Sequence, residues 1–323
     1  MVAPDPPQHR FPWFADAYVT WSAPIVPWPH DGVPGSTLRE TSASTVRRRS
    51  PAGDDRVPAC VLALGVVVDP GLTACRAPGK YSGPVFSPEG PSARELAAQA
   101  LSSVEGGYDL LAPKFDHTPF RTPDGVLDAT VAALGRFGPF GRGLDVCCGT
   151  GAGLRVLTSL CQGPVTGVDF STGMLTQARR AHPDATWVRA DVRALPFAGA
   201  FGLAVSFGAL GHFRPAERPA LFAGVYRALR PGGVFAFPVA APLPVTSRWY
   251  WALAGFDLAM RVRNALWRPP FVMYYRTCPL SAVQGDLAAS GFTVTTVPLT
   301  ALGRREDGSP KARLVLARTA STP

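Results

Sequence analysis

A short apolar run that breaks into glycines constrains the fold of this 323-residue chain more than any other stretch: Gly-Leu-Asp-Val-Cys-Cys-Gly-Thr-Gly-Ala-Gly-Leu at 143–154. Residues 144–148 lack polar alternation, which suits a strand buried on both faces of a parallel sheet. The glycines allow a tight turn against a ligand, and leucines recur at helical spacing from Leu154 onward. The stretch predicts a nucleotide-binding strand, loop and helix, with the first helical amides facing the ligand and Asp145 just before the bend.

The spacing within this loop separates two classes of cofactor. A dinucleotide fingerprint needs glycine or alanine three residues after its second glycine, and the chain has Leu154 there. The pattern is instead acidic-x-small-x-Gly-x-Gly, formed by Asp145, Cys147, Gly149 and Gly151.

Two further apolar segments end in acids. The run 165–168 leads into Asp169, 20 residues beyond Gly149, where a carboxylate can accept both hydroxyls of a ribose. The run 185–190 leads into Asp191. Either acid alone is more often a helix cap or a loop carboxylate, but three acids at the ends of three successive strands indicate one ligand site.

In these motifs the sequence resembles the class I S-adenosylmethionine-dependent methyltransferases over about residues 105–320. The resemblance implies that the loop holds the amino acid and ribose of S-adenosylmethionine, that Asp191 binds the adenine amino group, and that the Val192 amide meets the ring. Tyr108 begins a Tyr-Asp-x-x-Ala segment like one that folds over the cofactor in this family, although a lone aromatic is as readily explained by packing. The cofactor-binding residues expected from the resemblance are Tyr108, Asp145, Cys147, Gly149, Thr150, Gly151, Asp169, Phe170, Met174, Asp191, Val192, Ser206 and Phe207.

The rhythm of the remaining segments predicts an α/β, Rossmann-like doubly wound sheet. Strands are expected near 143–148, 164–169, 185–190, 201–206 and 233–238, with helices near 152–161, 172–182 and 219–229 between them. A helix over about 280–290 precedes two strands, 292–297 and 312–318, joined by a turn, which should pair antiparallel. A mainly parallel, seven-stranded sheet that ends in an antiparallel hairpin is the arrangement that the resemblance implies.

The chain before this core divides into two parts. Residues 1–91 carry 15 of the 34 prolines and no sustained period, so we expect a mostly disordered extension; a start codon further downstream is the alternative. The run 61–68 is apolar enough to dock on the domain. Ser92 and Glu95 form a capping box that opens the methyltransferase domain, residues 92–323. Thr122 is expected to cap a helix that stops at Gly135 and leads into the first strand.

Composition limits the partners. The net charge of +9 comes from scattered arginines without a dense basic block, which disfavours nucleic acid. Six cysteines without a C-x-x-C pair or clustered histidines indicate neither a metal nor a disulfide framework and suit a cytoplasmic protein. No run approaches the length of a membrane span.

The segment after the fourth strand should contain the residues that indicate the class of methyl acceptor. It lacks the Asn/Asp-Pro-Pro-aromatic element of amine methyltransferases and the Pro-Cys of cytosine C5 enzymes, which leaves a small molecule, with a protein or RNA as the alternative. His212 is the histidine close to the expected methyl position, and it is a candidate general base for a hydroxyl acceptor or a mere orientation aid. A module that binds the cofactor without turnover, and a nicotinamide- or flavin-dependent oxidoreductase, are alternatives from other functional classes.

The insertion 245–278 carries apolar side chains around most of a helix. One stripe is Trp249, Leu253, Phe256, Met260 and Trp267, and a neighbouring stripe is Tyr250, Leu258, Val262 and Leu266, with a basic flank at Arg261, Arg263 and Arg268. Such a helix is buried, pairs with a second copy in a homodimer, or contacts a lipophilic ligand. We expect a lid over the carboxyl edge of the sheet and an apolar, ring-containing or prenylated acceptor.

Overall fold

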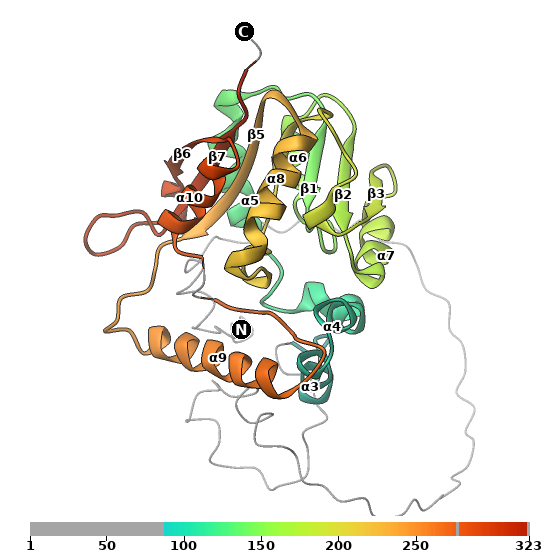
Figure 1. Ribbon diagram of the computed structural model, residues 1–323, viewed down its shortest axis with the longest axis vertical. Helices are drawn as coiled ribbons and strands as arrows, with labels where there is room; N and C mark the ends of the chain where they lie inside the picture. Colours follow the sequence, from blue (N-terminus) through green and yellow to red (C-terminus); the bar gives the residue numbers. More distant parts are fainter. Residues whose placement is uncertain (1–86, 276–277, 322–323) are drawn as a thin grey trace, which may run out of the picture.

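The computed structural model describes residues 87–275 and 278–321. Within them the chain forms one seven-stranded sheet with strand order β3-β2-β1-β4-β5-β7-β6 (Figure 1). The first five strands in the chain are β1 (Gly143–Val146), β2 (Val165–Asp169), β3 (Thr186–Arg189), β4 (Phe201–Val205) and β5 (Leu229–Ala240). They pair in parallel, whereas β7 (Ala312–Arg318) lies antiparallel between β5 and β6 (Thr293–Pro298). The predicted sheet and its antiparallel hairpin are confirmed.

The order of the strands determines where a ligand can lie. From β1 the chain moves outward to β2 and β3, then returns to the other side of β1 with β4 and β5. The carboxyl ends of β1 and β4 therefore flank the point where the strand order reverses, which is the crevice that binds ligands in open α/β sheets.

Helices cover both faces of the sheet, because every central strand is buried on both sides. On one face α5 (Asp124–Leu134) and α6 (Leu154–Leu160) pack through Leu127 and Leu157 on Leu203 and Val234. On the other face α8 (Arg218–Ala228) and α10 (Leu280–Ala289) enclose a cluster around Phe235. The remaining helix of the alternating core, α7 (Thr172–Ala181), follows β2.

Local capping rules succeeded at some helix ends and failed at others. Ser92 and Glu95 form the predicted capping box of α3 (Ala93–Leu101), and Gly291 (φ +96°) follows α10 as a left-handed stop. Thr122 is not a cap: α5 has Pro123 at its N-cap position without a side-chain bond. The helix does stop at Gly135, its C-cap, as predicted; this glycine stays right-handed (φ −54°) and continues into a 3-10 turn.

The fifth strand, predicted near 233–238, starts before residues 230–233. These residues lie inside β5, which already begins at Leu229, and Gly232 adopts a positive φ of +70° within it. The register between β4 and β5 shifts between Phe201 and Leu203, so the extra residues form an irregularity in the strand.

Three further elements lie beyond one end of the sheet (Figure 1). They are α3, α4 (Val104–Leu111) and the 19-residue α9 (Arg248–Leu266), and η2 (Ala112–His117) continues α4. The extension predicted for residues 1–91 falls almost entirely on 1–86, outside the described residues. Among those described, no helix is long and apolar enough to cross a membrane.

Candidate active site

The loop after β1 is held open by left-handed backbone at three positions. Cys147 (φ +58°), Gly149 (φ +53°) and Gly151 (φ +97°) all have positive φ, and Cys147 is the single non-glycine residue with positive φ among those described. A side chain is disfavoured in this region, so Cys147 holds a strained conformation at the mouth of the site. The sequence pattern required a small residue there, and the structure supplies the reason.

Asp145 lies beneath the loop with its carboxyl buried. A Cβ built on Gly153 would overlap Asp145 Oδ2, so the start of α6 can cover this carboxyl only because residue 153 is glycine. Asp145 Oδ2 has no hydrogen-bond partner. Burial, together with the nearby charge of Asp169, raises the pKa of Asp145 well above its usual value. Sequence reasoning had given Gly153 no role, although the three alternating glycines were visible.

Asp169 connects the first two strand ends. Its Oδ2 accepts from the Gly149 amide at 2.9 Å, and its Oδ1 accepts from the Ser171 amide at 2.9 Å. Burial raises the pKa of Asp169, while these amide bonds oppose the rise. The carboxylate therefore fixes the glycine loop and keeps only its remaining lone pairs for a ligand.

The third predicted acid lies elsewhere. Asp191 caps a short 3-10 turn and pairs with Arg193, whose hydrogen bond lowers the pKa of this carboxyl. Neither Asp191 nor the buried Val192 lines the pocket that the loop after β1 borders. Ser206 is also outside the lining, with its Oγ donating to the Val146 carbonyl at 2.8 Å. Their roles toward a cofactor stay predictions.

A latch from the N-terminal helices closes over the loops. Asp109 Oδ1 on α4 accepts from Ser171 Oγ at 2.6 Å and from the Gly173 amide at 2.7 Å. A Cβ on Gly173 would approach the Asp109 Cα to 2.9 Å, so this contact depends on glycine at the start of α7. Thr150 Oγ1 in turn donates to Asp116 Oδ1 at 2.7 Å. Sequence reasoning quoted the Tyr-Asp-x-x-Ala segment but gave Asp109 no role.

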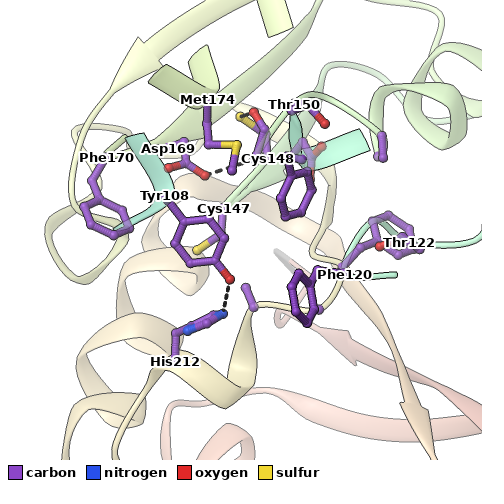
Figure 2. Close-up of a pocket in the computed structure, with 18 of the residues that line it drawn as sticks. Tyr108, Phe120, Thr122, Cys147, Cys148, Thr150, Asp169, Phe170, Met174 and His212 are labelled. Atoms are coloured by element: carbon purple, nitrogen blue, oxygen red, sulfur yellow. Dashed lines mark hydrogen bonds between the residues drawn. The ribbon is translucent and has the colours of Figure 1, made fainter. Parts of the chain in front are cut away.

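Tyr108 and His212 form a hydrogen-bonded pair in the same pocket (Figure 2). The Tyr108 hydroxyl lies 2.8 Å from His212 Nε2, and His212 Nδ1 lies 2.8 Å from the Val272 carbonyl oxygen. Because a carbonyl can only accept, Nδ1 carries the proton and Nε2 accepts from the tyrosine. Burial lowers the pKa of His212 and raises that of Tyr108, so both side chains are neutral near pH 7. The lone pair of His212 Nε2, which a general base would need, therefore already accepts the hydrogen bond from Tyr108.

These elements enclose a pocket with about 770 Å³ of space between protein atoms, including open solvent. Ten of the predicted site residues line it: Tyr108, Asp145, Cys147, Gly149, Thr150, Asp169, Phe170, Met174, Phe207 and His212. Gly151 does not, because a side chain there would point toward His182 and Trp187. The remaining lining residues are Val104, Phe115, Phe120, Thr122, Cys148, Ala152, Gly153, Gly208, Ala209 and Phe213, of which sequence reasoning had named none as ligand contacts.

The helix of the insertion reaches this pocket only indirectly. Neither Trp249, which is buried, nor Trp267, which is exposed, belongs to the lining, so the expected direct lid is not seen. The return segment after α9 instead touches the site: the Phe271 ring stacks near Tyr108 with centroids 6.5 Å apart, and Val272 holds His212.

A family model of the methyltransferase domain matches residues 144–233, which contain the loop and the four strand ends described above. Residues 144–233 are therefore a methyltransferase domain, and the comparisons support the class I S-adenosylmethionine-dependent kind. Relatives agree: an uncharacterized methyltransferase of Synechocystis is 32% identical over 127 residues, covering 39% of this chain and 58% of the relative. A demethylmenaquinone methyltransferase of Beutenbergia cavernae is 37% identical over 137 residues, covering 40% and 55%. The matches thus span little more than half of these relatives.

The fold agrees with solved structures as well. An O-methyltransferase family protein from Burkholderia thailandensis superposes with a TM-score of 0.52 at 16% identity, covering 71% of this chain and 67% of that one. At this identity the likeness concerns the fold alone.

The pocket itself fits S-adenosylmethionine, which carries a sulfonium and an ammonium group. Two buried carboxyls, Asp145 and Asp169, line it, and the described lining residues include no lysine or arginine. Asp145 Oδ2 is an orphaned acceptor that an ammonium group could satisfy, and a cation would lower the raised pKa of both acids.

Proposed function

We propose that the protein transfers the methyl group of S-adenosylmethionine to a small, apolar, ring-containing acceptor. The observation that carries the proposal is the contrast between the two sides of one pocket. Carboxyls and loop amides lie on the β1–β2 side, whereas Phe115, Phe120, Phe207 and Phe213 line other parts. A neutral acceptor meets aromatic faces there, and an anionic one would meet no lysine or arginine among the lining residues that the structure describes.

The cofactor side acts by binding and orientation. When bound, S-adenosylmethionine supplies an activated methyl on a sulfonium, so the protein has chiefly to hold the reactants in line and exclude water. Asp145 would accept from the ammonium group, and the free lone pairs of Asp169 would accept from the ribose hydroxyls. The latch made by Asp109 keeps α4, with Tyr108, over this side.

The acceptor side has one polar pair, Tyr108 and His212. In this pair His212 Nε2 accepts from the Tyr108 hydroxyl, whose oxygen can accept a further hydrogen bond from an acceptor hydroxyl. His212 would then be a positioning residue for Tyr108. Direct proton removal by His212 requires the Tyr108 bond to break first, so general-base catalysis by His212 is the weaker of the two roles.

The named relatives act on two different classes of small acceptor. Besides the demethylmenaquinone methyltransferases, one match is an N,N-dimethyltransferase for a dTDP-linked amino sugar from Streptomyces venezuelae, 39% identical over 93 residues. That sugar nucleotide is polar and anionic, and the lack of lysine and arginine in the described part of the lining argues against such an acceptor here.

The test is a tritiated-methyl transfer screen in which quinone-like, phenolic, polyketide and fatty acceptors are compared with polar amines. Phe120→Ala should raise the KM for an apolar acceptor by about tenfold or more, because burying an aromatic side chain contributes about 1.5–3 kcal/mol. Phe137→Ala is the matched control, since this aromatic is partly exposed outside the pocket. Transfer only to polar amines would overturn the acceptor class. If the purified protein binds NAD(P) but not S-adenosylhomocysteine, the proposed methyltransferase activity is overturned.

A further inference from the structure

The outward face of α9 is apolar, and none of the other elements that the structure describes covers it. Trp251 is 65% exposed, Leu258 62%, Val262 49% and Leu266 81%, and Gly255 and Ala265 lie among them. At about 100° per residue these positions fall on one side of the helix. A continuous exposed apolar stripe of this kind marks an interaction surface.

The inward face of the same helix is fully engaged. Met260 packs with Phe271, Val272 and Tyr274 in a small core, and Asn264 bonds both the amide and the carbonyl of Phe271. Arg263, expected at the basic flank, is instead buried and donates to the carbonyls of Pro269 and Ser102. These contacts fix the helix on α3 and the return segment, so the apolar stripe is held outward by the fold.

Charge on the stripe has one sign. Arg248 and Arg261 are exposed on opposite borders of it, and Arg268 is exposed just beyond its end. The sole acid on α9, Asp257, is buried and accepts from the Tyr275 amide at 2.8 Å. Trp251 lies near the start of the stripe and the exposed Trp267 at its end, and tryptophans favour the boundary between apolar and aqueous phases.

From this combination we propose that α9 docks on an anionic lipid surface, with the stripe among the upper acyl chains and the three arginines on the headgroups. Helices with an apolar face and basic borders bind in this way. A twofold contact between two copies is disfavoured, because a self-complementary interface would place arginine borders opposite each other without an acid on the stripe to pair them. Among the described elements, Figure 1 places α9 away from the sheet, on the same side of it as α3 and α4.

Docking through α9 would bring the lipid surface near the pocket. The segment that leaves α9 carries Phe271 and Val272, which contact Tyr108 and His212. A lipophilic acceptor drawn from the surface would have a short way to the aromatic side of the site. The docking itself does not depend on methyl transfer, so each can fail without the other.

The experiment is vesicle flotation of the full chain without cofactor, comparing phosphatidylcholine vesicles with vesicles that also contain phosphatidylglycerol. The protein should float with the anionic vesicles at low ionic strength and be released by salt. Leu258→Glu with Val262→Glu should weaken binding at least tenfold, and Arg248→Gln with Arg261→Gln by about 25-fold at about fivefold per arginine. All four side chains are exposed, and circular dichroism with a thermal midpoint confirms folding of each variant.

Phe137→Glu is the control for the apolar change, since this exposed ring precedes β1 at the opposite, amino-terminal edge of the sheet. Arg180→Gln is the control for charge, because Arg180 is exposed on α7. Failure to float, or equal flotation of the stripe variants and the controls, overturns the proposal. Dimerisation in light scattering that the Leu258/Val262 variant abolishes, without flotation, would assign the stripe to a second copy and overturn it too.

Discussion

Replacing Asp109 tests whether α4 is latched over the cofactor loops. Its carboxylate accepts two short bonds, at 2.6 Å from Ser171 Oγ and 2.7 Å from the Gly173 amide, at the N-terminus of α7. Hydrogen bonds to charged groups contribute about 1.5–3 kcal/mol each. Because Asp109 is partly exposed and water can replace part of this, Asp109→Ala should lower the free energy of unfolding by about 2–4 kcal/mol.

Asp109→Asn separates charge from shape. The amide oxygen can still accept one of the two bonds, and neutral bonds are worth about half as much as charged ones, so the loss should be about half that of the alanine variant. Both variants free α4 to open, which carries Tyr108 away from the pocket and should raise the Kd for S-adenosylhomocysteine about tenfold for alanine and less for asparagine.

Denaturant titration measures the stability and calorimetry measures the Kd. Asp128→Ala is the matched control: this acid pairs with Arg155 on an exposed surface at 2.6 Å, where such pairs contribute at most about 1 kcal/mol. The latch is refuted if Asp109→Ala binds the ligand as tightly as the unaltered protein, or if the control loses as much stability.

Four further substitutions probe the pocket. Asp169→Ala should weaken S-adenosylmethionine binding by about 1–3 kcal/mol, and an unchanged calorimetric Kd in a folded variant would exclude the ribose role. Gly151→Arg should abolish binding, because a side chain at φ +97° meets His182 and Trp187 at 3.0 Å and distorts the loop; full affinity contradicts this. Burial raises the pKa of Asp145, so its contribution to the free energy of unfolding is fully present at or below the unfolded pKa of 3.8 and should be lost as pH rises through the folded pKa. Asp145→Asn should remove this loss from denaturation curves measured across pH. Identical curves for the variant and the unaltered protein would contradict the burial argument. Burial lowers the pKa of His212, so its contribution to the free energy of unfolding is present above pH 6.5 and should fall as pH drops toward the folded pKa. His212→Gln should flatten this pH dependence. Full turnover by the same variant across pH would remove His212 from the mechanism.

The strand, loop and helix of the predicted cofactor half could be predicted because their determinants are local. Strand β1, its loop and α6 follow one another within 143–160, so burial pattern, glycine spacing and strand-end acids could be interpreted together. The direction of individual side chains could not be predicted. Asp191 turns to Arg193 and Gly151 faces Trp187, and neither outcome is encoded in spacing alone.

Helix ends were less predictable, since the competing backbone conformations at a helix end differ little in free energy. Thr122 has the residue type of an N-cap, yet Pro123 takes the position because its fixed φ suits an extended residue before the helix. Gly135 can adopt either hand, and here the chain tightens into a 3-10 turn before β1.

The acceptor half could not be predicted, because it is assembled from segments far apart in the chain that meet at glycines. A Cβ on Gly107 would meet Phe271 Cε2 at 2.8 Å, and one on Gly211 would meet the Tyr274 carbonyl oxygen at 2.7 Å. These two close approaches seat the return segment of the insertion on α4 and on the loop after β4, and thereby set the Tyr108, His212 and Val272 chain of bonds. In sequence each glycine is an ordinary helix or loop residue, and the apolar helix of the insertion, α9, predicted a lid over the pocket. Its inward face is used instead to hold the return segment, which leaves its outward face, with tryptophans and arginines, available to a surface beyond the protein.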